Sequence, residues 1–447
     1  MDVLNFKEQL TEITGDGYID SELYTKFNVK RGLRNADGTG VLVGLTRVGE
    51  VNGYMISEGE KVAIPGKLIY RGIDVEDIAA ASTQDGRFLF EETVYLLLFG
   101  KLPTKENLDK FIALLGSVRA LPKNFAEDVI MRAPSRDIMN KLASSILALY
   151  PYDTAPEERS SINVLRQCIE LISRFPTIVA YSYVSMKHYF DNESLVIHQC
   201  EPSLSIAETL LTLIRPDKKF TPYEAQLLDL ALVLHAEHGG GNNSTFTVHV
   251  VSSADTDVYS AISSGIGSLK GFRHGGANFK VIEMMDDIMK NVKNWESEGE
   301  VADYLAKILR GEAYDNSKLI YGQGHAVYTI TDPRVRLLRD KAELLAEEKG
   351  LINEFNLHKL IERIVPEIFK KVKGSDKDIC TNVDFYSGFV YKMLGLPLEL
   401  NTPIFAVSRV SGWCAHLLEE IYVGNRIIRP AYKCVQPHTG YVEIGNR

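Results

Sequence analysis

The sequence HAEHGGGNNST, residues 235–245, sets the interpretation of the whole chain. It follows an apolar run from Ala225 to Leu234, which predicts a buried helix. In front of that run, Thr221-Pro222-Tyr223-Glu224 is a capping-box pattern with proline at the first helical position. We therefore expect His235 and His238 on the last turn of this helix, before three glycines that let the backbone turn. Polar groups at such a place indicate a site.

Two later stretches also set a histidine among glycines. His274 lies in Gly271-Phe272-Arg273-His274-Gly275-Gly276-Ala277-Asn278, and His325 follows Gly322-Gln323-Gly324. Glycines let the backbone approach a ligand closely, and histidine exchanges protons near pH 7. The alternative for each stretch is a loop histidine whose neighbouring glycines serve only the turn. Spacing alone does not make the two histidines a pair.

Length and composition indicate a soluble protein with more than one domain. The 447 residues exceed one ordinary core, and 45% hydrophobic with 24% charged residues is typical of globular proteins. A net charge of −9 argues against a general nucleic-acid surface but allows a local basic pocket. The five cysteines form no C-x-x-C pair, which suits a reducing compartment. Since the N-terminus lacks a targeting pattern and no apolar stretch is long enough for a membrane span, we expect a cytoplasmic location.

The expected fold class is mainly α with a small N-terminal β element. Residues 41–48 and 66–70 read as short strands, with turns at Gly53 and at Glu58-Gly59. From about residue 74 onward the pattern is helical, for example from Phe90 to Phe99. Residues 1–40 are polar and irregular.

A stripe of small residues lies on one face of the helix expected from about residue 256 to 268. Ala261, Ser264, Gly265 and Ser268 follow the helical spacing, although Gly265 lowers helix propensity. Close packing against another helix explains this pattern. The second helix can belong to the same subunit or lie across a dimer axis.

Charged candidates stand at helix ends and turns. Asp384 begins an apolar helix, where an Asp is by default an N-cap, but a carboxylate held ionised by the helix N-terminus also suits a general base. Asp332-Pro333-Arg334 begins another helix. Arg334, Arg409 and Arg429 can each be a surface charge, whereas together they can clamp carboxylates.

Other chemistries are poorly supported. A zinc site at His235 and His238 needs further ligands from distant parts of the chain, so we expect a structural core histidine at 235, a ligand-binding one at 238, and no metal. A hydrolase elbow and a phosphate-binding loop are both missing from the sequence. The glycines at 322 and 324 do not extend to a dinucleotide fingerprint.

Taken together, these stretches resemble the citrate synthase family, over about Gly66 to Arg429. The matching stretches are Gly66-Lys67-Leu68-Ile69-Tyr70-Arg71-Gly72, Tyr95-Leu96-Leu97-Leu98-Phe99-Gly100, His235-Ala236-Glu237-His238, Leu269-Lys270-Gly271 with His274-Gly275-Gly276-Ala277-Asn278, Gly324-His325-Ala326-Val327 through Asp332-Pro333-Arg334, Asn382-Val383-Asp384-Phe385-Tyr386-Ser387-Gly388, and Arg409 with Gly412-Trp413-Cys414-Ala415-His416 and Arg429-Pro430.

The resemblance implies an enzyme of the tricarboxylic acid cycle that condenses acetyl-CoA with oxaloacetate and hydrolyses citryl-CoA. It implies a helical two-domain fold: an extension at 1–40, a large domain at 41–278 and 386–447, and a small domain at 279–385 that closes over the site. It further implies a homodimer or higher oligomer without a tightly bound cofactor, because acetyl-CoA is a substrate. Neither nucleic acid nor a membrane is expected as a partner.

The resemblance also implies a role for each matching residue. Asp384 corresponds to the base that takes a proton from the acetyl methyl group, His274 to the donor at the thioester oxygen, and His325 to the acid at the oxaloacetate carbonyl. The oxaloacetate-binding set is His238, Arg334, Arg409 and, supplied by the neighbouring subunit, Arg429. The loop Gly322-Gln323-Gly324 is expected to contact CoA.

Some positions depart from the family pattern near CoA. Thr329 replaces a basic residue, Gln323 replaces an aromatic one, Phe272-Arg273 precedes the catalytic histidine, and residues 55–65 form an insertion. These departures leave 2-methylcitrate synthase, which uses propionyl-CoA, as the rival within the family. Rivals from other classes are a catalytically silent scaffold and a metal-dependent hydrolase built on the histidines of the opening stretch.

Overall fold

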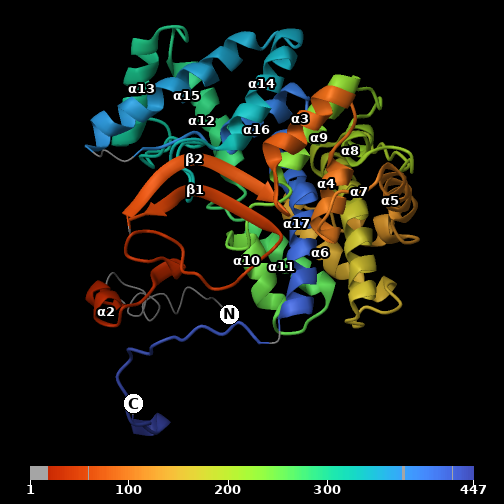
Figure 1. Ribbon diagram of the computed structural model, residues 1–447, viewed down its shortest axis with the longest axis horizontal. Helices are drawn as coiled ribbons and strands as arrows, with labels where there is room; N and C mark the ends of the chain where they lie inside the picture. Colours follow the sequence, from red (N-terminus) through yellow and green to blue (C-terminus); the bar gives the residue numbers. More distant parts are fainter. Residues whose placement is uncertain (1–18, 59, 375–377, 425, 447) are drawn as a thin grey trace. The chain divides into compact units, whose positions relative to one another are not determined.

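The chain forms a small antiparallel sheet and then helices along most of its length, which confirms the expected fold class (Figure 1). This structure is a computed structural model that describes residues 19–58, 60–374, 378–424 and 426–446. The chain divides into two compact units, residues 46–427 and residues 1–45 with 428–447. The described part of the smaller unit contains α2 (Ser21–Lys26), η2 (Arg31–Leu33) and η6 (Ile444–Asn446).

The sheet has the strand order β1 (Gly49–Ser57), β2 (Glu60–Tyr70) and β3 (Ile73–Asp74). The expected strand at 66–70 is therefore part of β2. The strand expected at 41–48 is wrong: this segment has no ladder partner, and its Leu42 and Leu45 side chains are 84% and 91% exposed. Gly53 is not a turn but lies in β1, at the point where the register with β2 shifts.

The larger unit is built from helices of very different lengths. They are α3 (Val75–Asp85), α4 (Phe90–Phe99), α5 (Lys105–Val118), η3 (Ala126–Met131), α6 (Ile138–Ala148), η4 (Tyr150–Tyr152), α7 (Ser161–Asp191), α8 (Ile206–Ile214), α9 (Pro222–His235), α10 (Asn243–Ser252), α11 (Val258–Leu269), α12 (Ala277–Asn291), α13 (Glu298–Arg310), α14 (Pro333–Glu348), α15 (Ile352–Lys373), α16 (Asp384–Met393), η5 (Leu398–Leu400) and α17 (Asn401–Val423).

Helix α17 is the central element of the larger unit. It packs against α4, α7, α9, α10 and α11, and its residues 403–418 are all buried (Figure 1). The small-residue stripe of α11 meets this packing at Gly265. A Cβ there would lie 2.8 Å from Val248 of α10 and 3.3 Å from Trp413 of α17. Close packing within the subunit thus explains this glycine.

The sequence signals placed several helix ends correctly. Thr221 and Glu224 form the expected capping box of α9, with Pro222 at the first helical position. Helix α4 ends at the left-handed Gly100, and Asp332 is the N-cap of α14. These signals are local hydrogen bonds and backbone conformations, so they need no knowledge of the tertiary structure.

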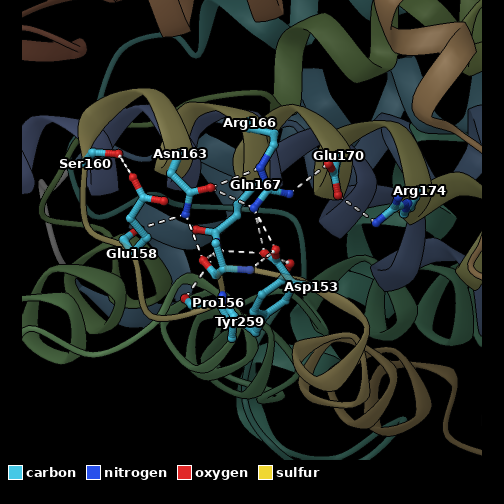
Figure 2. Close-up of polar contacts among 11 residues, drawn as sticks. Asp153, Pro156, Glu158, Ser160, Asn163, Arg166, Gln167, Glu170, Arg174 and Tyr259 are labelled. Atoms are coloured by element: carbon cyan, nitrogen blue, oxygen red, sulfur yellow. Dashed lines mark hydrogen bonds and ion pairs between the residues drawn. The ribbon is translucent and has the colours of Figure 1, made fainter.

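A polar cluster ties the segment after η4 to α7 and α11 (Figure 2). The buried Asp153 carboxylate accepts hydrogen bonds from Arg166 at 2.7 Å, Gln167 at 2.8 Å and the Tyr259 hydroxyl at 2.7 Å. Burial works against ionisation, but the hydrogen bonds outweigh it and lower the pKa of Asp153 to about 2. The cluster therefore holds an ionised carboxylate at the base of α11, the helix that leads toward His274.

The predicted small domain, residues 279–385, covers α12 to α15. In Figure 1 these helices gather at one end of the larger unit, next to α16. Its closure over a site stays a prediction, as do the boundaries of the large domain. Among the described residues, no helix combines the length and apolar character that crossing a bilayer requires.

Candidate active site

Helix α9 ends earlier than we expected from residues 235–245. His235 is the last residue of α9, and His238 lies beyond the helix end rather than on its last turn. Gly239, which follows, takes the left-handed φ of +78° that glycine adopts without strain. His235 is fully buried against the Phe405 ring at 4.4 Å, and burial lowers its pKa well below the usual value. The sequence suggested a satisfied core histidine here. The burial agrees, but neither ring nitrogen has a hydrogen-bond partner among the described residues.

His238 meets the loop that follows α13. Its ring centroid lies 5.1 Å from that of His325 and 5.6 Å from that of Tyr328, while the His325 and Tyr328 rings stack at 4.5 Å. Burial, followed by the charge of Arg334, lowers the pKa of His238 well below its usual value. Its Nε2 atom is buried and has no hydrogen-bond partner among the described residues. Two of the three predicted histidines are thus neighbours, although 87 residues separate them in sequence.

The backbone fixes the tautomer of His325. The backbone N–H groups of Val327 and Tyr328 both donate to its Nδ1 atom, at 3.0 and 3.1 Å. Nδ1 must therefore carry the lone pair, and the proton resides on Nε2. Burial lowers the pKa of His325 to about 4, so the ring is neutral at pH 7. It can offer one N–H to a ligand.

His274 has the opposite tautomer. It is held at the start of α10, where the backbone N–H of Ser244 has no intrahelical acceptor and donates to His274 Nε2 at 3.3 Å. The Ser244 hydroxyl also contacts Nε2 at 2.9 Å and accepts from the Trp413 indole at 3.2 Å. The His274 proton is therefore on Nδ1. Burial lowers its pKa to about 4, so this ring is also a neutral donor.

Only glycine fits beside His274. A Cβ on Gly275 would lie 2.5 Å from the carbonyl oxygen of Leu269, and the Gly275 N–H donates to that same oxygen at 3.0 Å. The glycine is thus needed for the close turn that follows α11. The sequence analysis gave turn geometry as the alternative role of these glycines, and Gly275 has that role.

Two buried arginines supply the positive charge. Arg334 donates to its N-cap neighbour Asp332 through Nε at 2.9 Å and through one terminal nitrogen at 2.7 Å. Arg409, on α17, donates through Nε to the His235 carbonyl at 2.7 Å and lies over the Phe405 ring. The remaining guanidinium nitrogens keep donors for other acceptors. Burial lowers the pKa of Arg409 to about 10, so it stays charged at pH 7.

Asp384 is the first residue of α16, and Val383 is the N-cap. We expected the helix N-terminus to hold its carboxylate ionised, but burial raises the pKa of Asp384 to about 6. The charges of Arg334 and Arg409 work in the opposite direction and limit the rise. The group is therefore mostly ionised at pH 7 and easily protonated, which suits a general base.

The loop Gly322-Gln323-Gly324 is attached to the segment before α16. The Gly324 N–H donates to the Cys380 carbonyl at 2.7 Å, and the Asn382 side chain donates to the Gly324 carbonyl at 2.9 Å. These bonds join the segment that carries His325 to the one that carries Asp384. Contacts of this loop with CoA stay a prediction.

The sheet supports the His325 loop in a way the sequence did not indicate. Gly53 and Gly66 let β1 and β2 approach it, since added Cβ atoms would lie 2.5 Å from the Val327 carbonyl oxygen and 2.1 Å from that of Thr331. The Gly66 N–H donates to the Thr331 hydroxyl at 3.1 Å. Gly66 was part of the family resemblance, but nothing in the sequence identified its partner.

The structure thus brings most predicted site residues within reach of the same charges. His238 and His325 are in ring contact and both feel the charge of Arg334, His274 feels that of Arg409, and Asp384 feels both. Ser244 and Tyr328 were missed, although each lies close in sequence to a histidine that we had singled out. Arg429 belongs to the smaller unit and is exposed, so its role stays a prediction. Among the described residues, no cluster of three or more His, Cys, Asp or Glu side chains could hold a metal ion.

Comparisons with known proteins show which family the chain resembles. The family described as "Citrate synthase, C-terminal domain" matches residues 36–431. Citrate synthase from Haloferax volcanii is 34% identical over 90% of this chain and 94% of its own. That from Deinococcus radiodurans is 36% identical over 89% and 98%. A 2-methylcitrate synthase from Shewanella oneidensis is 32% identical over 85% and 92%.

The fold agrees as well. The solved structure of citrate synthase from Thermoplasma acidophilum, a ternary complex with carboxymethyl coenzyme A and oxaloacetate, superposes with a TM-score of 0.75 at 27% identity. The alignment covers 94% of this chain and 99% of that one. Because the family match spans most of its length, this chain belongs to the citrate synthase family.

Proposed function

We propose that this protein condenses acetyl-CoA with oxaloacetate and hydrolyses the citryl-CoA that forms. The observation that supports this most is the pair of neutral histidines with opposite, backbone-fixed tautomers, together with a buried carboxyl group whose pKa is about 6 and which shares the charge of Arg334 and Arg409. Such a set provides one base and two N–H donors. The curated relatives and the Thermoplasma complex agree with this reaction.

In the first step, Asp384 takes a proton from the acetyl methyl group. That proton is very weakly acidic, so the negative charge that develops on the thioester oxygen must be stabilised at the same time. The Nδ1–H of His274 is the donor for this oxygen. One such oriented donor is worth roughly 3–4 kcal/mol of transition-state stabilisation.

In the second step, the enol carbon attacks the carbonyl carbon of oxaloacetate and a carbon–carbon bond forms. The Nε2–H of His325 donates to the carbonyl oxygen, which becomes the hydroxyl of the product. Water then cleaves the thioester and releases CoA and citrate. His238, Arg334 and Arg409 bind the two carboxylates of oxaloacetate, for which bidentate arginine pairing is well suited.

The proposal also includes the assembly and the setting of the enzyme. We place Arg429 in the site of a neighbouring subunit of a homodimer or larger oligomer, because an exposed arginine near the end of the chain can reach a second copy. No tightly bound cofactor is needed, since acetyl-CoA enters as a substrate. All five cysteines are free, which supports the reducing conditions of the cytoplasm.

The second candidate is 2-methylcitrate synthase, which the similarity to the Shewanella relative favours and which the departures at Gln323 and Thr329 leave open. The test measures kcat/KM for CoA release with acetyl-CoA and with propionyl-CoA at saturating oxaloacetate. One methylene is worth roughly 10–200-fold in a binding pocket, so the two activities separate clearly. Preference for acetyl-CoA supports the first function, preference for propionyl-CoA supports the second, and no CoA release with either refutes both.

A further inference from the structure

A chain of four titratable side chains lies behind the proposed oxaloacetate site, and the mechanism above uses none of them. It consists of Glu237, His416, His249 and Glu420. Glu237 Oε1 lies 3.1 Å from His416 Nε2, His416 Nδ1 lies 3.2 Å from His249 Nε2, and His249 Nδ1 lies 2.9 Å from Glu420 Oε2. Glu237 and His416 are fully buried, whereas His249 and Glu420 are 15% and 18% exposed.

The hydrogen bonds of this chain determine how many protons it holds. A carboxylate only accepts hydrogen bonds, so each of the three contacts needs a proton from an imidazole nitrogen. Two neutral imidazoles supply only two such protons, so the three contacts together need one proton more than two neutral rings and two carboxylates hold. Burial, followed by the neighbouring His416, lowers the pKa of His249.

The Glu237 carboxylate occupies a space that two glycines leave open. A Cβ on Gly49 of β1 would lie 2.7 Å from Glu237 Cγ, and one on Gly412 of α17 would lie 2.4 Å from Glu237 Oε2. Burial raises the pKa of Glu237, but His416, the charge of Arg409 and the Gly239 N–H lower it by more. The net effect is a pKa below the usual value of a glutamate. The carboxylate is therefore ionised in a site shaped for it.

These contacts surround the turn that carries His238. On one side, the Glu237 backbone is bound by the Tyr70 hydroxyl, which donates to its carbonyl at 3.1 Å. On the other side, the Asn242 side chain donates to the Gly239 carbonyl at 2.5 Å. His238 lies between these two fixed residues. If the carboxylate loses His416, an unpaired buried charge remains, and the turn must move to relieve it.

We propose that Glu237 and His416 are positioning residues for oxaloacetate, because their buried pair fixes the turn that presents His238. This inference rests on the proposed function, since it assigns His238 to the substrate. His249 and Glu420 complete the hydrogen bonds of His416 and so belong to the same support.

The test measures the Kd of oxaloacetate by calorimetry for the intact protein and for His416→Leu, together with KM and kcat. We expect Kd and KM for oxaloacetate to rise about tenfold, which corresponds to the loss of one charge-assisted hydrogen bond from His238, while kcat at saturating oxaloacetate changes little. The conservative variant His416→Gln keeps an N–H donor for Glu237, so it should stay within about twofold of the wild type.

Leu417→Ala is the matched control, because Leu417 is the buried neighbour of His416 on α17. It should lower the melting temperature without changing Kd. If His416→Leu does not fold, Gly49→Ala displaces the same carboxylate from the opposite side and should also weaken oxaloacetate binding. The inference is overturned if these variants bind oxaloacetate as the wild type does, or if the control weakens binding equally. A wild type that does not bind oxaloacetate refutes the proposed function instead.

Discussion

Replacing Asp384 by Asn should stabilise the folded protein. Burial raises the pKa of this carboxyl from its ordinary 3.8 to about 6, a difference of about 2 units worth about 1.4 kcal/mol each. Because the pKa of Asp384 is higher in the folded protein than in the unfolded chain, this carboxyl group favours folding most at a pH below its pKa in the unfolded chain. That contribution is lost as the pH rises through about 6. At pH 8 the ionised carboxylate therefore destabilises the fold by about 3 kcal/mol, and the neutral Asn does not.

The expected shift in melting temperature follows from the chain length. An unfolding entropy of about 2.1 cal/mol/K per residue gives about 0.9 kcal/mol/K for 447 residues, so Tm should rise by about 3 °C at pH 8. At pH 5 the folded carboxyl is mostly protonated, and the rise should be about half as large. Differential scanning calorimetry at both pH values measures this. An Asn variant that melts at or below the wild-type temperature at pH 8 would refute the reasoning.

Three further predictions concern the site. The kcat/KM for acetyl-CoA should fall about tenfold per pH unit below about pH 6, where Asp384 becomes protonated, and a pH–rate profile that stays flat to pH 5 would contradict its role as base. Gly66→Ala should lower kcat about tenfold or more, because the added Cβ overlaps the Thr331 carbonyl oxygen and displaces the catalytic loop; the control Gly267→Ala, whose Cβ meets nothing within 4 Å, should not. Arg429→Ala should raise KM for oxaloacetate, and an unchanged KM would argue that each site is built from one chain.

Several helix ends could be predicted from sequence because their signals are local, and the candidate site residues were chosen from patterns that are equally local. The capping box at Thr221 and the glycine after α4 mark helix termini through bonds within a few residues. Histidines among glycines indicated the segments of the candidate site. The order of the matching stretches along the chain indicated the family. Proton transfer needs side chains such as histidine and aspartate, and the sequence shows directly where these residues occur.

The rest depends on contacts between distant segments. The pattern at 41–48 resembles a strand, but a strand needs a partner, and none of the described segments pairs with it. The same reason explains why the two tautomers were missed, since each is set by a backbone N–H that the fold brings to the ring. The raised pKa of Asp384 was also missed, because burial outweighs the helix N-terminus only in the folded chain.

The central claim is that Asp384 removes the proton from acetyl-CoA in a site that already holds oxaloacetate. The most direct test compares CoA release by the wild type and Asp384→Asn, with the Kd of oxaloacetate measured on both. We predict that the wild type releases CoA only when both substrates are present. The variant should lose at least a thousandfold in kcat, roughly the scale of losing an essential base, while its Kd for oxaloacetate stays within about threefold. Near wild-type turnover by Asp384→Asn would contradict the account.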